Sequence, residues 1–251
     1  MEFLRLIGAE CLKMRRTILP LIHVSVPVAV SILFLGYYSF APWSEQSQIS
    51  VYVEVLGVAL PFLISMICAA AVELETENHF QVFLGVVQGR KRVLAAKWLV
   101  LLGLGLFALS LAVGIFAAGY YYLLGKNSLT LGLCVTLTGV LWVGSISLYM
   151  WHLFLNLRFS KTISMGIGIG ETLISALFLT GLGDGRWQYV PAGFSARGSS
   201  ELLYFRFAMQ AGNGMSGELL KKMECCLLIT VFLCVIIFLW FQFYEGRVCD
   251  D

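Results

Sequence analysis

The chain has 251 residues, of which 59% are hydrophobic and 13% are charged, with a mean hydropathy of +0.85. A soluble globular domain has about 45–50% apolar and roughly 25% charged residues, so the composition excludes that class. The formal net charge is only +2. The charges lie in short patches, separated by apolar stretches long enough for a helix to cross a bilayer, which takes about 20 residues.

Six apolar stretches are predicted to be membrane-spanning helices: residues 18–40, 51–72, 98–124, 130–155, 162–182 and 225–243. Lipid offers no hydrogen bonds to the backbone, so each stretch must satisfy its own, as a helix does. Barrel strands would alternate apolar and polar residues over about ten positions, whereas these stretches are apolar throughout. We therefore expect an all-α integral membrane protein with a single domain, whose first span is a signal anchor rather than a cleaved signal peptide.

The distribution of Lys and Arg predicts the orientation of these helices. Basic residues gather before the first span and in the second and fourth loops, whereas the first loop has none and the third has only Lys126. We therefore expect both termini in the cytoplasm. The fifth loop, 183–224, is expected outside by parity although it carries basic residues, because long loops cross membranes largely regardless of charge.

Few residues in the sequence have the pattern of a catalytic or metal site. There is no phosphate-binding G-x-x-x-x-G-K-[ST] motif, and the seven cysteines lack the spacing of zinc sites or disulfides. We therefore expect no metal site, no cofactor bound by this chain and no enzymatic activity of its own, and we interpret the cysteines as small packing residues.

Two polar features lie within the predicted spans. His152 and Asn156 form an H-x-x-x-N pattern in the fourth span, as in intramembrane proteases of the CAAX-processing type, but the paired glutamates of those enzymes are absent. Glu171 lies inside the fifth span, where an unpaired charge costs roughly 2.5–3.5 kcal/mol. It is either a functional residue or a protonated carboxyl that is hydrogen-bonded between helices, for example to a Ser or Thr.

The second loop, 73–97, reads ELETENHFQVFLGVVQGRKRVLAAK. One apolar helical face is predicted there, formed at i, i+3, i+4 and i+7 by Phe80, Phe83, Leu84 and Val87. Asn78 is a plausible N-cap, Gly89 a plausible C-terminal stop, and the basic run that starts at Arg90 suits lipid headgroups. This amphipathic helix either lies on lipid or docks into a groove of a cytosolic partner.

The whole pattern resembles the permeases of the ABC-2 type, which have six spans, an amphipathic N-terminal elbow, a coupling helix between spans two and three, and a long external segment before span six. Their counterparts here are FLRLIGAECLKMRRT within an elbow at 1–17, the coupling segment at 73–97, and GDGRWQYVPAGFSARG within 183–224. Within that family the chain is most similar to the permease subunits of lantibiotic immunity transporters (MutG/NisG type), through AECLKMRRTILPLIHVSVPV, ETENHFQVFLGVVQGRKRVLAAK and WQYVPAGFS.

The resemblance implies a subunit of an ABC exporter in the bacterial plasma membrane, of the type V kind. It implies a second permease subunit and a cytosolic ATPase dimer that binds ATP and Mg²⁺ and docks on the coupling helix. The implied substrate is a cationic amphipathic peptide, which Trp187, Tyr189 and Phe194 could contact; these aromatics could equally form only the interfacial belt. Lipid is a further expected partner and nucleic acid is not. The alternatives are an ABC-2 efflux permease for another amphipathic compound, a secondary carrier that depends on Glu171, and an intramembrane protease.

Overall fold

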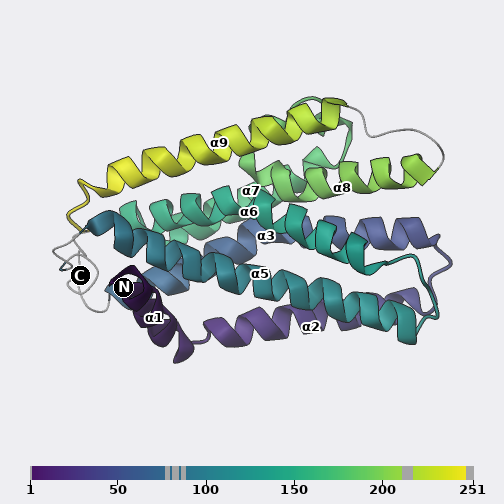
Figure 1. Cartoon of the computed structure of the whole chain (residues 1–251), viewed down its shortest axis with the longest axis horizontal. Helices are drawn as coiled ribbons and strands as arrows, with labels where there is room; N and C mark the ends of the chain where they lie inside the picture. The colour runs from purple at the N-terminus through teal and green to yellow at the C-terminus, as the bar shows by residue number, and fades with distance from the viewer. Residues whose placement is uncertain (1, 77–79, 81–84, 86–88, 211–216, 247–251) are drawn as a thin grey trace.

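The computed structural model describes residues 2–76, 80, 85, 89–210 and 217–246. These residues form helices and no strands, and five of the helices are long and apolar enough to cross a membrane. They are α2 (Leu19–Tyr38), α3 (Glu45–Thr76), α5 (Arg90–Tyr122), α6 (Leu131–Arg158) and α9 (Gly217–Phe241). They extend along the long axis of the molecule (Figure 1). The fold agrees with the predicted all-α membrane class.

The predicted fifth span, 162–182, corresponds to α7 (Lys161–Phe178), which is not among the five helices that qualify as spans. It is the shortest of the predicted spans in the structure, and its 18 residues include the charged Lys161 and Glu171. The structure therefore supports five of the six predicted spans by length and composition.

The segment predicted as an external loop, 183–224, is largely helical over its described residues. It follows the short 3₁₀ helix η1 (Gly181–Gly183) and contains η2 (Trp187–Tyr189) and α8 (Pro191–Gln210). The last span, α9, begins at residue 217 rather than at 225, because its charged first turns continue the helix. α8 packs against both α3 and α6.

Two glycines allow α8 to approach its neighbours closely. A Cβ atom at Gly57 of α3 would lie 2.5 Å from the Cα of Ala196, and one at Gly144 of α6 would lie 2.8 Å from the backbone nitrogen of Ser195. Small residues at helix interfaces commonly serve this purpose in membranes. The polar segment is thus held inside the bundle by backbone contacts.

The first helix, α1 (Glu2–Arg15), lies across one end of the bundle (Figure 1). We call this end the α1 end; it also contains the ends of α3, α6 and α9 and the beginnings of α2, α5 and α7. Leu4 and Leu12 of α1 are exposed, whereas Leu6 and Ile7 pack against the core. α1 therefore packs one side against the core and leaves apolar residues exposed on the other.

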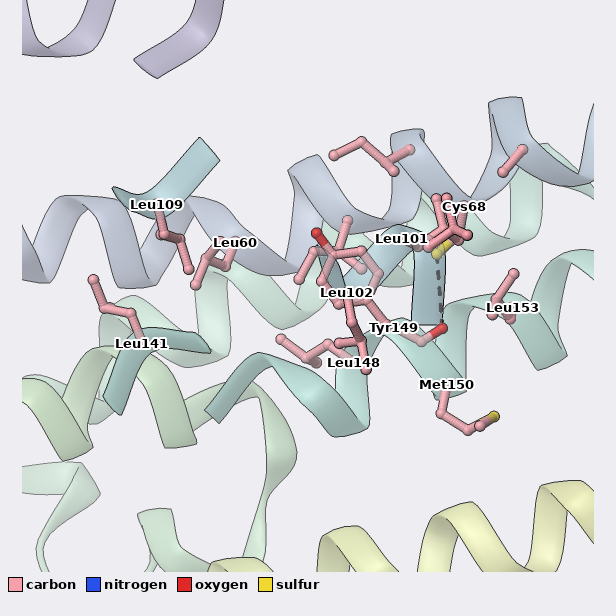
Figure 2. Close-up of a cluster of buried hydrophobic side chains, with 14 of the residues drawn as sticks. Leu60, Cys68, Leu101, Leu102, Leu109, Leu141, Leu148, Tyr149, Met150 and Leu153 are labelled. Atoms are coloured by element: carbon pink, nitrogen blue, oxygen red, sulfur yellow. Dashed lines mark hydrogen bonds between the residues drawn. The ribbon is translucent and has the colours of Figure 1, made fainter. Parts of the chain in front are cut away.

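The core between α3, α5 and α6 consists mainly of leucine side chains around Tyr149 (Figure 2). Cys68 is fully buried there, with its thiol 3.7 Å from the backbone oxygen of Tyr149. At the end opposite α1, the rings of Tyr52 and Phe116 stack with centroids 3.7 Å apart. The inference that cysteines serve as packing residues fits Cys68, although Cys11 is exposed.

We expect Gly57→Ala to lower the melting temperature of the purified protein. The added methyl group must displace the α8 backbone, and overpacking of this kind costs about 1–3 kcal/mol. Gly103→Ala is the matched control, since nothing lies within 4 Å of its added Cβ, and it should leave the melting temperature unchanged or raise it. Equal melting temperatures for the two variants would show that α8 is not packed against α3 at this position.

Candidate functional site

Four charged side chains meet at the α1 end and form what we call the inner ion quartet: Glu10, Lys13, Glu75 and Lys97. Lys97 of α5 lies 2.7 Å from Glu10 of α1 and 2.8 Å from Glu75 of α3. Lys13 lies 2.7 Å from Glu10 and 2.9 Å from Glu75. Each lysine thus contacts both carboxylates, and the quartet joins three helices with no net charge.

The quartet is largely shielded from solvent. Glu10, Glu75 and Lys97 are at most 3% exposed, whereas the side chain of Lys13 is 29% exposed. Partial burial alone would lower the pKa of Lys13, but its hydrogen bonds and its attraction to Glu10 and Glu75 outweigh burial and raise that pKa. Lys97 also donates to the backbone oxygen of Ala71, 3.3 Å away. Buried charges persist when they are paired in this way.

The sequence interpretation missed this quartet, because Lys97 was counted only among the basic residues of the second loop. A signal was present in the sequence. Lys97 stands alone between apolar residues in VLAAKWLV, whereas Arg90 to Arg92 form a continuous basic run. Glu10 and Lys13 have the i, i+3 spacing of a helical ion pair.

A second junction at the α1 end anchors the segment between α3 and α5. Arg90 donates to the backbone oxygen of Tyr244 at 3.0 Å, and the Tyr244 hydroxyl donates to the backbone oxygen of Leu157 at 2.8 Å. The ring of Phe80 meets the Tyr244 ring edge-on, with centroids 6.1 Å apart. Tyr244 follows α9 and Leu157 lies in the last turn of α6, so this junction links the α3–α5 segment to both helices.

The structure describes only some residues of the predicted coupling helix. Asn78, Phe83, Leu84 and Val87 lie outside the described residues. Phe80 is a turn residue with a φ of +57°, and Gly85 is exposed and has no regular secondary structure.

Phe80 and Gly85, which fall within the predicted helix, are therefore not helical, and a left-handed residue such as Phe80 interrupts helical geometry. Phe80 is 2% exposed and contacts Tyr244, so it does not present an accessible docking face as predicted. Gly89 does not end a helix but precedes α5, with a φ of +106°.

Two residues that the sequence analysis treated separately, His152 and Glu171, are in contact. The Nε2 atom of His152 on α6 lies 2.8 Å from a carboxylate oxygen of Glu171 on α7. The Nδ1 atom of His152 lies 3.0 Å from the Ser164 hydroxyl, which also accepts a hydrogen bond of 2.8 Å from the Asn156 amide. Glu171 thus has a histidine partner, in place of the predicted Ser or Thr.

The donors and acceptors of this network have a consistent order. The Asn156 amide nitrogen can only donate, so the Ser164 oxygen accepts and the Ser164 proton is available for Nδ1 of His152. The Nε2–H of a neutral imidazole then donates to the Glu171 carboxylate. Asn156 also donates to the backbone oxygen of His152 at 2.7 Å. The H-x-x-x-N pattern therefore has a role in joining α6 to α7.

The three aromatic residues that were predicted to contact a peptide substrate lie near the end of the bundle opposite α1, and they differ in solvent exposure. Trp187 and Phe194 are buried, at 1% and 3% exposure, whereas Tyr189 is exposed. Trp187 and Phe194 line an apolar cavity of about 350 Å³ between α6, α8 and α9. The Trp187 indole donates to Glu201 at 2.8 Å. Tyr189 alone has the exposure of an interfacial residue.

Among the described residues, no group of three or more His, Cys, Asp or Glu side chains has the arrangement of a metal site. No family model, curated protein or solved structure matches this chain.

We expect Lys97→Met to destabilise the protein by about 3–5 kcal/mol, because it leaves two buried carboxylates with only Lys13 between them. The double variant Glu10→Leu with Lys97→Met retains the neutral pair of Lys13 and Glu75, and should be more stable than the single variant. Unfolding of the purified chain in detergent, analysed as a double-mutant cycle, measures this coupling.

Lys161→Met is the control for the quartet, because Lys161 forms an exposed pair with Glu73 at 2.5 Å. An exposed ion pair of this kind contributes about 0–1 kcal/mol. If Lys97→Met were no more destabilising than Lys161→Met, the quartet would not hold α1, α3 and α5 together.

Proposed function

We propose that this chain is the permease subunit of an ATP-binding cassette exporter of the ABC-2 type. It would expel a lantibiotic-type cationic amphipathic peptide from the bacterial plasma membrane. The observation that carries this proposal is the arrangement at the α1 end. An amphipathic helix lies across the bundle there and is fixed by the inner ion quartet to the two helices that flank the α3–α5 segment.

The lengths of α3 and α5 support a docking role for the segment between them. They contain 32 and 33 residues, which corresponds to about 48–50 Å of helix at 1.5 Å per residue. The hydrocarbon core of a bilayer is about 30 Å thick. Both helices are therefore long enough to project from the membrane. We assign the α1 end to the cytosol because basic residues gather there.

In this mechanism the ATPase is a separate cytosolic dimer, which binds ATP and Mg²⁺, and a second permease subunit completes the transporter. The ATPase contacts the α3–α5 segment at its exposed part, represented by Gly85. Displacement of that segment reaches α6 and α9 through Arg90 and Tyr244, and α1 through the inner ion quartet. The helices then move as rigid bodies.

We expect a sensitive host that expresses the chain with the ATPase and the partner permease encoded beside it to tolerate higher concentrations of a nisin-like peptide. Protection should disappear when the phosphate-binding lysine of that ATPase is replaced, since transport then lacks its energy source. Growth inhibition measures the effect. Equal sensitivity of the complete and the ATPase-deficient hosts would contradict ATP-driven export of this peptide.

Crosslinking in the same host tests the docking surface itself. In a chain whose own cysteines are replaced by serine, Gly85→Cys should crosslink to the ATPase. Tyr122→Cys, at the opposite end of the bundle and 80% exposed, is the matched control and should not. Crosslinking of Tyr122→Cys with none for Gly85→Cys would reverse the assigned orientation.

A second candidate function is proton-linked secondary transport, which the buried contact of His152 with Glu171 favours. Intramembrane acids paired with histidine occur in proton relays. Such a carrier would work without an ATPase, and its cycle would require Glu171 to bind and release a proton.

Glu171→Gln separates the two functions, because it keeps a hydrogen-bonding group beside His152 and removes the titratable carboxyl. An ABC permease should keep nearly all of its ATP-dependent export in this variant. A proton-linked carrier should lose transport entirely, and its wild type should continue to transport after ATP depletion while a proton gradient is maintained. Transport of a fluorescent peptide into inverted vesicles measures both outcomes.

A further inference from the structure

A cavity of about 90 Å³ lies between α2, α3, α5 and α6, apart from the inner ion quartet and the His152 network. Its lining is almost entirely apolar and includes Leu60 and Leu109, which Figure 2 shows facing one another, and Tyr149. On the α2 side the lining includes His23 and Pro27. The cavity is therefore apolar, with one imidazole side chain in its lining.

His23 is only 2% exposed and offers a hydrogen-bond acceptor without a partner. Its Nδ1 atom lies 2.7 Å from the backbone oxygen of Leu19, which can only accept, so Nδ1 carries the proton. In the neutral ring Nε2 is then an acceptor, and none of the described residues donates to it. A buried unsatisfied acceptor costs about 1–3 kcal/mol, which a ligand donor would recover.

Pro27 leaves the backbone carbonyl of His23 as a second acceptor next to Nε2. Proline has no backbone N–H, so Pro27 cannot bond to the carbonyl four residues before it in the helix, which belongs to His23. His23 therefore lacks a donor at Nε2 and lacks the usual helical donor at its carbonyl. Both positions belong to a turn of α2 that borders the cavity.

We propose that this cavity binds small apolar molecules that carry one hydroxyl group, such as aliphatic alcohols of three to five carbons. The alkyl chain lies among the apolar residues and the hydroxyl donates to Nε2 of His23. The two acceptors of His23 are the minimum that a buried water needs, and the rest of the lining is apolar; an apolar cavity of roughly 150 Å³ is known to take benzene. The smaller space here suits a shorter, unbranched molecule.

Polar contacts close the side of the cavity beside Ala112. The Tyr52 hydroxyl donates to the backbone oxygen of Ala112 at 2.9 Å, and the Ser31 oxygen lies 3.0 Å from the Tyr52 oxygen. These contacts join α2, α3 and α5 beside Ala112, which lines the cavity. The site does not depend on the proposed transport function, and its test uses the chain alone.

The test measures binding of 4-fluorobutan-1-ol to the purified full-length chain in nanodiscs by fluorine NMR, with 1-fluorobutane as the ligand that lacks a hydroxyl. We expect saturable binding of the alcohol, displaced by unlabelled n-alcohols. Their affinity should rise about fourfold per methylene and stop rising beyond about five carbons. Partition into lipid would continue to rise with chain length.

Two variants locate the site. His23→Phe should weaken binding of the alcohol about fivefold while changing that of 1-fluorobutane little, and Ala108→Leu, which fills the cavity, should weaken both. Absence of saturable binding to the wild type would overturn the proposal without any variant. So would an equal effect of His23→Phe on both ligands, or affinity that keeps rising with chain length.

Discussion

Four charges that neutralise one another away from water determine how the α1 end of this protein is built. A lysine or glutamate buried alone costs several kcal/mol, so Glu10, Lys13, Glu75 and Lys97 are tolerable only together. This requirement fixes the distance between α1, α3 and α5 at one level of the bundle. It also places α1 across the bundle, because Glu10 and Lys13 must reach the ends of two neighbouring helices.

The same principle extends to the other helices. In lipid there is no hydrophobic force that drives apolar helices together, so close packing and hydrogen bonds have to supply the association. The His152 network joins α6 to α7, Tyr244 joins α9 to α6, and glycines at residues 57 and 144 admit α8 between α3 and α6. Polar contacts thus occur where helices meet, rather than on the surfaces that face lipid.

The sequence alone predicted the all-α membrane class and, among six expected spans, the five that the structure supports, because these depend on local composition and length. It did not predict the helix α8, whose polar residues look like those of a loop until Gly57 and Gly144 are seen to make room for it. The contact of His152 with Glu171 was also missed, although both residues were singled out. Their pairing depends on how α6 and α7 are placed, and no periodicity within one segment encodes that placement. The burial of Phe80 has the same origin, since its partner Tyr244 lies more than 160 positions further along the chain.

The contact of Arg90 and Phe80 with Tyr244 has a consequence for biogenesis. Membrane helices enter the bilayer in order as the ribosome makes them, yet this junction joins the segment before α5 to a residue that follows α9. The α3–α5 segment therefore cannot reach its final environment until nearly the whole chain has been synthesised and inserted.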